Sequence, residues 1–189
     1  MKTLTLHLNM MLTALFLTCG CTMHQTASTN YPTKSLNTST VKTLDVKQYM
    51  GKWYEIARFD HRFERGMDNV VTTYTLLPNG KIEVVNEGYK KGKRSISRGK
   101  AYVPDATNHP AQLRVSFFLW FYSDYYILEL DESEYLYAVV GSSSSDYLWI
   151  LYRHPEMPEE LLTSLLQRIE QRGYDVTKLI FVKHDTTNQ

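Results

Sequence analysis

Residues 51–58 read Gly-Lys-Trp-Tyr-Glu-Ile-Ala-Arg, and their aromatic and β-branched side chains predict a β-strand. Seven comparable runs follow at regular intervals. Turn residues separate them, and Pro78-Asn79-Gly80 is the clearest hairpin signal. The runs are 70–76, 81–89, 99–103, 112–118, 125–130, 135–140 and 147–152. Eight short strands in this arrangement predict an antiparallel sandwich or barrel.

One helix is expected after the eighth strand. Pro158 suits the first turn of a helix, and the two glutamates that follow it favour the positive N-terminal end. Apolar residues recur at helical spacing as far as Ile169, and Gly173 is a natural stop. Residues 178–183 then predict one more short strand, so the expected order is eight strands, a helix and a closing strand.

Composition narrows the possible functions. The chain has 189 residues, which is enough for one domain with a sizeable core. A formal net charge of +1 gives no electrostatic basis for nucleic-acid binding. Aromatic residues make up 13% of the chain, and such residues line apolar pockets while keeping polar tips available. Both cysteines lie before residue 22, so the body holds no disulfide and no thiolate metal site.

The order of elements and two local motifs resemble the lipocalin family. Gly51-x-Trp53 lies in the first strand and Arg153 ends the eighth. Residues 51–66 and 146–155 are similar to the bacterial lipoprotein members of that family, and the resemblance covers about residues 44–183. It implies an all-β fold: an eight-stranded antiparallel up-and-down β-barrel with a C-terminal α-helix and a short closing strand. It also implies that Gly51, Trp53 and Arg153 form the barrel floor, with the guanidinium over the indole ring.

The N-terminus predicts a secreted lipoprotein. Residues 1–20 combine a basic residue, a short apolar segment and small residues, which is typical of a secretory signal. Gly20-Cys21 resembles a lipobox, in which the cysteine carries the lipid. Thr22 in place of Asp favours the outer membrane over the inner, and we expect a lipid-anchored chain on the periplasmic face of that membrane. The alternative is an ordinary cleaved signal with two incidental cysteines.

Three further segments are expected after the signal. Residues 21–43 are rich in Ser, Thr and Asn and predict a flexible tether. Residues 44–184 form the predicted barrel domain, and residues 185–189 are a short tail.

The resemblance also predicts which side chains meet a ligand. Side chains of a barrel strand alternate between lumen and exterior. If Trp53 and Arg153 point inward, Glu55 and Ala57 on the first strand should do so too. Alternation extended to the other strands gives the predicted ligand-binding residues Tyr74, Val84, Asn86, Val115, Phe117, Tyr125, Tyr147 and Trp149. The alternative is that these side chains simply fill a solid barrel.

Two charged segments have a functional and a neutral interpretation. Residues 59–66 join the first two strands, and the resemblance places this loop over the open end. There Arg62 could meet an anionic headgroup and Phe63 could cover an acyl chain, or the loop is merely solvated. Residues 90–100 hold six Lys and Arg around a turn. They form either a contact with anionic lipid or a soluble hairpin tip.

We therefore expect a binding module for a fatty acid or a lysophospholipid in the cell envelope, as either a monomer or a homodimer. No phosphate loop, nucleophile elbow or metal-ligand spacing is present, and no catalytic residue, cofactor or metal is expected. One alternative is a lipid- or pigment-modifying enzyme of the same fold, for which Glu55, His61 and Asp146 are the acid–base candidates. Another is a structural envelope protein with a filled barrel.

Overall fold

The computed structural model describes residues 35–185, which lie within one compact unit spanning residues 33–189. The predicted signal, Cys21, the first part of the predicted tether and residues 186–189 lie outside the described residues. The strands are β1 (Gly51–Phe59), β2 (Met67–Leu76), β3 (Ile82–Lys90), β4 (Lys93–Tyr102), β5 (Gln112–Phe118), β6 (Phe121–Leu130), β7 (Tyr137–Gly141), β8 (Leu148–Tyr152) and β9 (Leu179–Phe181).

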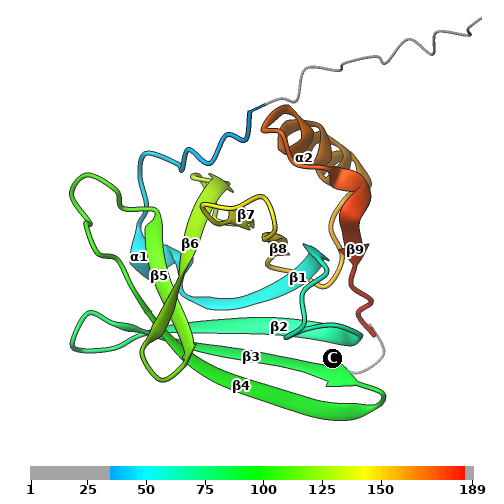
Figure 1. Ribbon diagram of the computed structural model, residues 1–189, viewed down its shortest axis with the longest axis horizontal. Helices are drawn as coiled ribbons and strands as arrows, with labels where there is room; N and C mark the ends of the chain where they lie inside the picture. The colour runs from blue at the N-terminus through cyan, green and yellow to red at the C-terminus, as the bar shows by residue number, and fades with distance from the viewer. Residues whose placement is uncertain (1–34, 186–189) are drawn as a thin grey trace, which may run out of the picture. The chain divides into compact units, whose positions relative to one another are not determined.

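The first eight strands form a closed antiparallel barrel, which confirms the predicted fold class. Neighbouring strands pair in the order β2-β3-β4-β5-β6-β7-β8-β1, and a further pairing of β1 with β2 closes the ring. β9 joins β1 beyond the ring by pairing antiparallel with it (Figure 1). The up-and-down order places the β1–β2 and β3–β4 connections at the end of the strands opposite to Trp53.

Two α-helices and an ordered N-terminal segment lie outside the barrel strands, and a 3-10 helix (Val176–Lys178) precedes β9. The short helix α1 (Val46–Tyr49) precedes β1, and Asp45 caps its first backbone amides. Helix α2 (Glu159–Gln171) was predicted at nearly these bounds. Residues 35–43 form no helix or strand, but their backbone bonds to Arg172 and to Ile127 of β6.

Two apolar clusters share the barrel wall. One lines the lumen and includes Trp53, Tyr74 and Ile127. The other lies on the outside of β1 and β6–β8, where Leu165 and Ile169 of α2 are fully buried. Alternation along each strand therefore supplies both clusters from the same wall, and α2 covers the outer one.

A β-bulge in β1 corrects one sequence-based prediction. The pairing of β1 with β8 shifts register between Glu55 and Ala57. Because side chains alternate with a period of two, one extra residue reverses the inside and outside of the strand beyond it. Ala57, expected in the lumen, therefore belongs to the outer cluster, and Arg58 is turned towards the polar groups of the lumen.

Candidate ligand-binding site in the barrel lumen

Trp53 and Arg153, which the resemblance predicts at the barrel floor, are in contact. Trp53 is fully buried, and the guanidinium carbon of Arg153 lies 3.7 Å from the centre of its ring. Arg153 also donates to the backbone carbonyls of Gln48, Lys52 and Tyr135 at 2.8–3.0 Å. Trp53 donates through Nε1 to the carbonyl of Tyr49. These bonds tie α1, β1 and the β6–β7 connection together beneath the lumen.

Three tyrosines stand above the floor and share their hydroxyl groups. The hydroxyl of Tyr125 lies 2.7 Å from those of both Tyr49 and Tyr74. Burial raises the pKa of all three hydroxyls above the ordinary tyrosine value, so each stays neutral. Apolar residues such as Val84, Leu113 and Ile127 surround these rings. This part of the lumen is apolar apart from one internally satisfied hydroxyl chain.

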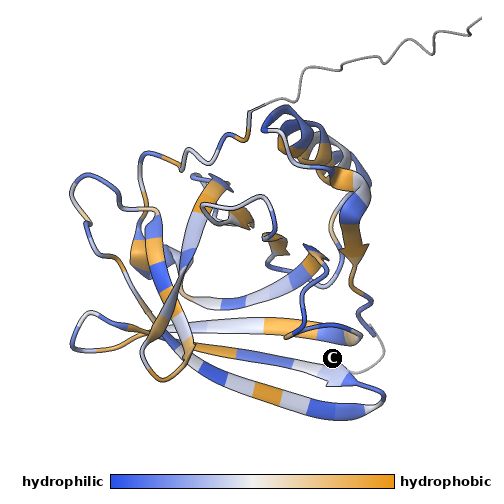
Figure 2. Cartoon of the chain, in the orientation of Figure 1, coloured by the Kyte–Doolittle hydropathy of each residue, from blue (hydrophilic) through white to orange (hydrophobic). Residues whose placement is uncertain are grey.

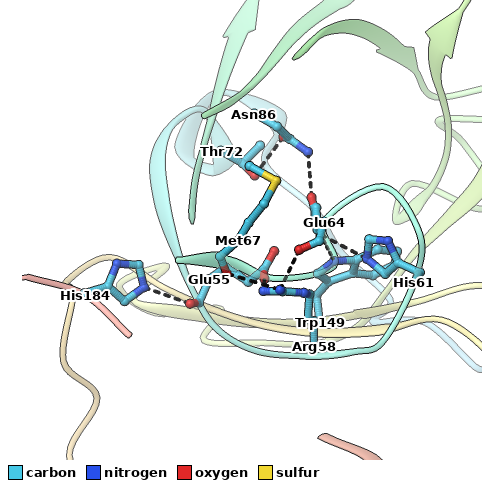
Figure 3. Close-up of polar contacts among 9 residues, drawn as sticks. All are labelled: Glu55, Arg58, His61, Glu64, Met67, Thr72, Asn86, Trp149 and His184. Atoms are coloured by element: carbon cyan, nitrogen blue, oxygen red, sulfur yellow. Dashed lines mark hydrogen bonds and ion pairs between the residues drawn. The ribbon is translucent and has the colours of Figure 1, made fainter. Parts of the chain in front are cut away.

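A buried charged cluster occupies the upper lumen (Figure 3). Arg58 of β1 is 1% exposed and donates from Nη1 to Glu55 at 2.6 Å. Its Nη2 donates to the backbone carbonyls of Glu64 and Met67. The Nε–H of Arg58 is buried and has no hydrogen-bond partner among the described residues. Arg58 therefore binds the β1–β2 loop and the start of β2, and its Nε–H has no partner among the described residues.

Glu64 closes the cluster from the β1–β2 loop. One carboxylate oxygen accepts from Nδ2 of Asn86 at 3.1 Å, and the other accepts from Nε1 of Trp149 at 3.2 Å (Figure 3). Nε2 of His61 lies 3.0 Å from the second oxygen as an ion-pair contact rather than an aligned hydrogen bond. Glu64 itself is 7% exposed. The loop thereby places a carboxylate inside the barrel, where Asn86 of β3, Trp149 of β8 and His61 of the loop itself contact it.

The two carboxyl groups of the cluster have opposite pKa shifts. Burial, followed by repulsion from Glu64, raises the pKa of Glu55 well above its ordinary value in spite of Arg58. For Glu64, burial acts in the same direction, but the contacts with His61, Trp149 and Arg58 together hold its pKa below the ordinary value. The cluster therefore keeps the loop carboxylate ionised and favours the neutral form of Glu55.

The structure brings some predicted ligand residues together and separates others. Tyr74 and Val84 are buried in the lumen, and Val115, Tyr125 and Trp149 pack against that cluster. Asn86 and Trp149 meet on Glu64. Tyr147 is partly exposed, but its ring stacks on that of Trp149 with centres 6.1 Å apart, so it borders the charged cluster. The remaining three predicted residues, Arg62, Phe63 and Phe117, are exposed.

Arg62 and Phe63 lie on the β1–β2 loop, and Phe117 lies at a register shift in β5. Arg62 lies over the ring of Phe63 at 4.8 Å, so these two side chains contact each other on the surface of the loop. The β5–β6 pairing shifts register between Val115 and Phe118. The ring of Phe117 covers Gly99, where an added Cβ would lie 2.8 Å from the ring. Glycine is therefore needed at position 99 for this contact.

Sequence reasoning missed Arg58 and Glu64 as site residues. Arg58 was hidden by the bulge, which no strand alternation reveals. Glu64 lies in a loop, where no periodicity gives a side-chain direction. Among the acid–base candidates, Glu55 and His61 belong to the cluster, whereas Asp146 is exposed in the β7–β8 connection and bonds to Ser144.

The described residues hold neither a cluster of potential metal ligands nor a helix fit to span a membrane. In residues 35–185, no group of three or more His, Cys, Asp or Glu side chains is placed to hold a metal ion. Within the same residues, no helix has the length and apolar character needed to span a membrane.

The fold and its plugged lumen define a class of protein: an up-and-down β-barrel cup with a helix on its wall. A family model described as a lipocalin-like domain matches residues 44–184. The chain is 42% identical to the outer membrane lipoprotein Blc of Escherichia coli strain K12 over 173 residues, covering 90% of this chain and 92% of that protein. The chain belongs to the lipocalin family.

Other relatives agree with this assignment. The chain is 41% identical to temperature-induced lipocalin-1 of Arabidopsis thaliana over 148 residues, covering 74% of this chain and 78% of that protein. Insecticyanin of Manduca sexta has a similar structure, with a TM-score of 0.64 and 19% identity, covering 82% of this chain and 89% of that chain. At that identity the structural likeness bears on the fold alone.

Proposed function

We propose that this lipocalin binds a single-chain lipid with an anionic headgroup, a fatty acid or a lysophospholipid, as a lipid-anchored protein of the bacterial outer membrane. One observation carries the ligand class. The carboxylate of Glu64 already occupies the upper lumen, where Asn86 and Trp149 donate to it. A carboxylate or phosphate at that position would use the same donors, with its chain in the apolar part of the lumen below.

Ligand entry on this proposal requires the β1–β2 loop to move. When the loop lifts, Glu64 leaves the lumen, and Nη2 of Arg58 loses the carbonyl of Glu64 as an acceptor, while the carbonyl of Met67 stays at the start of β2. Four donors can then bind a headgroup: Nδ2 of Asn86, Nε1 of Trp149, Nη2 of Arg58 and the already unpartnered Nε of Arg58. Buried donors without partners are unfavourable, so an anionic headgroup would stabilise the open arrangement.

The proposed location at the outer membrane rests on the named relatives and on the N-terminal motif. The relative from Escherichia coli is named an outer membrane lipoprotein and covers most of this chain. A lipobox-like Gly20-Cys21 supports the same anchor here. We infer a binding protein rather than an enzyme, because the buried acid Glu55 is paired with Arg58 and not with a nucleophile.

Displacement of a fluorescent fatty acid tests the ligand class. We expect saturable binding that lysophospholipid and unlabelled fatty acid both compete. Glu64→Gln should bind fatty acid roughly ten-fold more tightly, because the competing charge is removed and one charged hydrogen bond changes affinity by about that factor. Trp149→Phe keeps an aromatic ring but removes the Nε1 donor, and should bind fatty acid more weakly.

Controls separate headgroup recognition from general effects on the loop. Arg65→Ala removes an exposed ion pair with Asp60 on the same loop and should leave affinity unchanged. A fatty alcohol of equal length should not respond to Glu64→Gln. Absence of binding at micromolar ligand by both the parent chain and Glu64→Gln would refute the proposal. It would favour the alternative of a filled barrel, which is also consistent with tyrosine hydroxyls that bond to one another in the lumen.

A further inference from the structure

The hairpin turn between β5 and β6 carries an apolar tip with little contact to its own barrel. Phe118, Leu119, Trp120 and Phe121 are 55–74% exposed, and no charged residue interrupts them. Figure 2 shows this turn in the orange of hydrophobic residues. The rings of Phe118 and Phe121 stack on each other with centres 6.4 Å apart. A contiguous apolar tip of this kind on a soluble domain marks an interaction site.

Turn chemistry does not explain the tip. Leu119 has a φ of 50°, in the left-handed region where glycine and asparagine are favoured. A two-residue hairpin turn built for stability alone would place one of those residues there. The tip therefore combines backbone strain with exposed apolar area, and both are unfavourable for the isolated domain.

A basic strand lies beside the tip. β4 pairs with β5 only from Lys100 to Tyr102, and Nζ of Lys100 lies 5.7 Å from the ring centre of Tyr122, next to the hairpin turn. Residues 82–102 contain six Lys and Arg against two Glu, a net charge of +4. Both glutamates are paired, with Arg94 and Arg98. No described carboxylate lies within ion-pair distance of the lysines at 90, 91, 93 and 100. In Figure 1, β4 runs along the lower edge of the view, between the β5–β6 turn and the β3–β4 turn.

The same side of the barrel gives access to the lumen. From Lys93 to Arg98 every residue of β4 is exposed, although alternate side chains must face inward. Ser95 and Ser97 are the inward members, since they share the lumen face with Ala101. The wall between the first half of β4 and the β5–β6 hairpin is therefore not sealed by strand pairing.

We propose that the β5–β6 tip and the basic segment from Lys90 to Lys100, which includes the β3–β4 turn and most of β4, dock this barrel onto an anionic lipid bilayer, with the aromatic tip in the interfacial layer and the lysines on the headgroups. Aromatic side chains favour the membrane–water interface, and basic residues are attracted to anionic lipid. The fourteen residue-to-residue steps from Cys21 to Ser35 reach at most about 50 Å, so a chain anchored at Cys21 stays close to such a surface. Docking does not depend on the proposed ligand.

Tryptophan quenching by brominated phospholipid tests this docking on the full chain, purified from membranes and reconstituted into vesicles. Trp120 is the reporter, and a Trp120→Phe variant supplies the background from Trp53 and Trp149. We expect quenching of Trp120 in vesicles of phosphatidylcholine with phosphatidylglycerol. The variant Phe118→Ser/Leu119→Asn/Phe121→Ser keeps the reporter and should lose this quenching. Phe181→Ser, an exposed apolar position on β9, should retain it.

Two further arms decide between a bilayer and other occupants. Lys91→Glu/Lys93→Glu should reduce quenching in the anionic vesicles more than in phosphatidylcholine alone. Trp120 open to aqueous acrylamide but not to brominated lipid would overturn the proposal. Trp120 shielded from both quenchers would overturn it in favour of an interface with a second copy. Ligand displacement by the tip variant reports separately on the lumen, so failure of docking and failure of the proposed function give different results.

Discussion

The barrel floor gives a prediction whose size follows from the structure. Trp53→Ala removes a fully buried indole and should lower the free energy of unfolding by about 3–5 kcal/mol. Arg153→Ala removes a stacked guanidinium and leaves three carbonyls without their donor. Because this arginine is only partly buried, water can replace part of the loss, and we expect about 1–3 kcal/mol.

A double-mutant cycle measures the contact itself. The two side chains touch, so their effects should be non-additive by about 0.5–2 kcal/mol, the range for a cation over an indole face. Urea unfolding followed by far-ultraviolet circular dichroism suits all variants, since tryptophan fluorescence changes with the mutation. If Trp53→Ala does not fold, Trp53→Leu completes the cycle, because it removes the aromatic face beneath Arg153 and the bond from Nε1 to Tyr49 but keeps a large apolar side chain. Coupling of zero would refute the floor and the inward assignments built on it.

Other predictions follow from single residues. Glu55→Gln should become more stable relative to the parent chain as pH rises. The pKa of Glu55 is raised in the folded state, so the parent chain loses stability above the ordinary carboxyl pKa, whereas the glutamine variant does not. Urea unfolding measured at several pH values will show this difference. Leu119→Asn should raise the free energy of unfolding by about 1 kcal/mol by relieving the positive φ; a decrease in urea midpoint would contradict this. Cys21→Ala should release the chain from the membrane fraction or leave it unprocessed, and a processed variant that still sediments with membranes would exclude the lipid anchor.

The strands were predictable because burial imposes a period on the sequence. Alternation of apolar residues and the Pro78-Asn79-Gly80 turn gave the barrel, and the family resemblance gave the contact of Trp53 with Arg153. β4 was predicted too short, at residues 99–103, since its first half is exposed on both faces and carries no apolar period.

The charged cluster was not predictable in the same way. Ala57 was placed in the lumen because alternation was continued across a bulge, and the bulge depends on how β1 meets β8. The same bulge turns the side chain of Arg58 inward. Glu64 reaches the lumen through the path of a loop, which depends on three-dimensional contacts with Asn86 and Trp149 rather than on local sequence. The predicted ligand set therefore contained two of the donors but not the carboxylate that they hold.

Native mass spectrometry of the chain extracted from its own membranes tests the central claim most directly. The account predicts a species heavier than the bare chain by one fatty acid or one lysophospholipid, and retention of that lipid should increase in Glu64→Gln. A bare chain that acquires no lipid even after incubation with an excess of both classes would contradict a lipid-binding lumen and show that the barrel is filled by its own side chains.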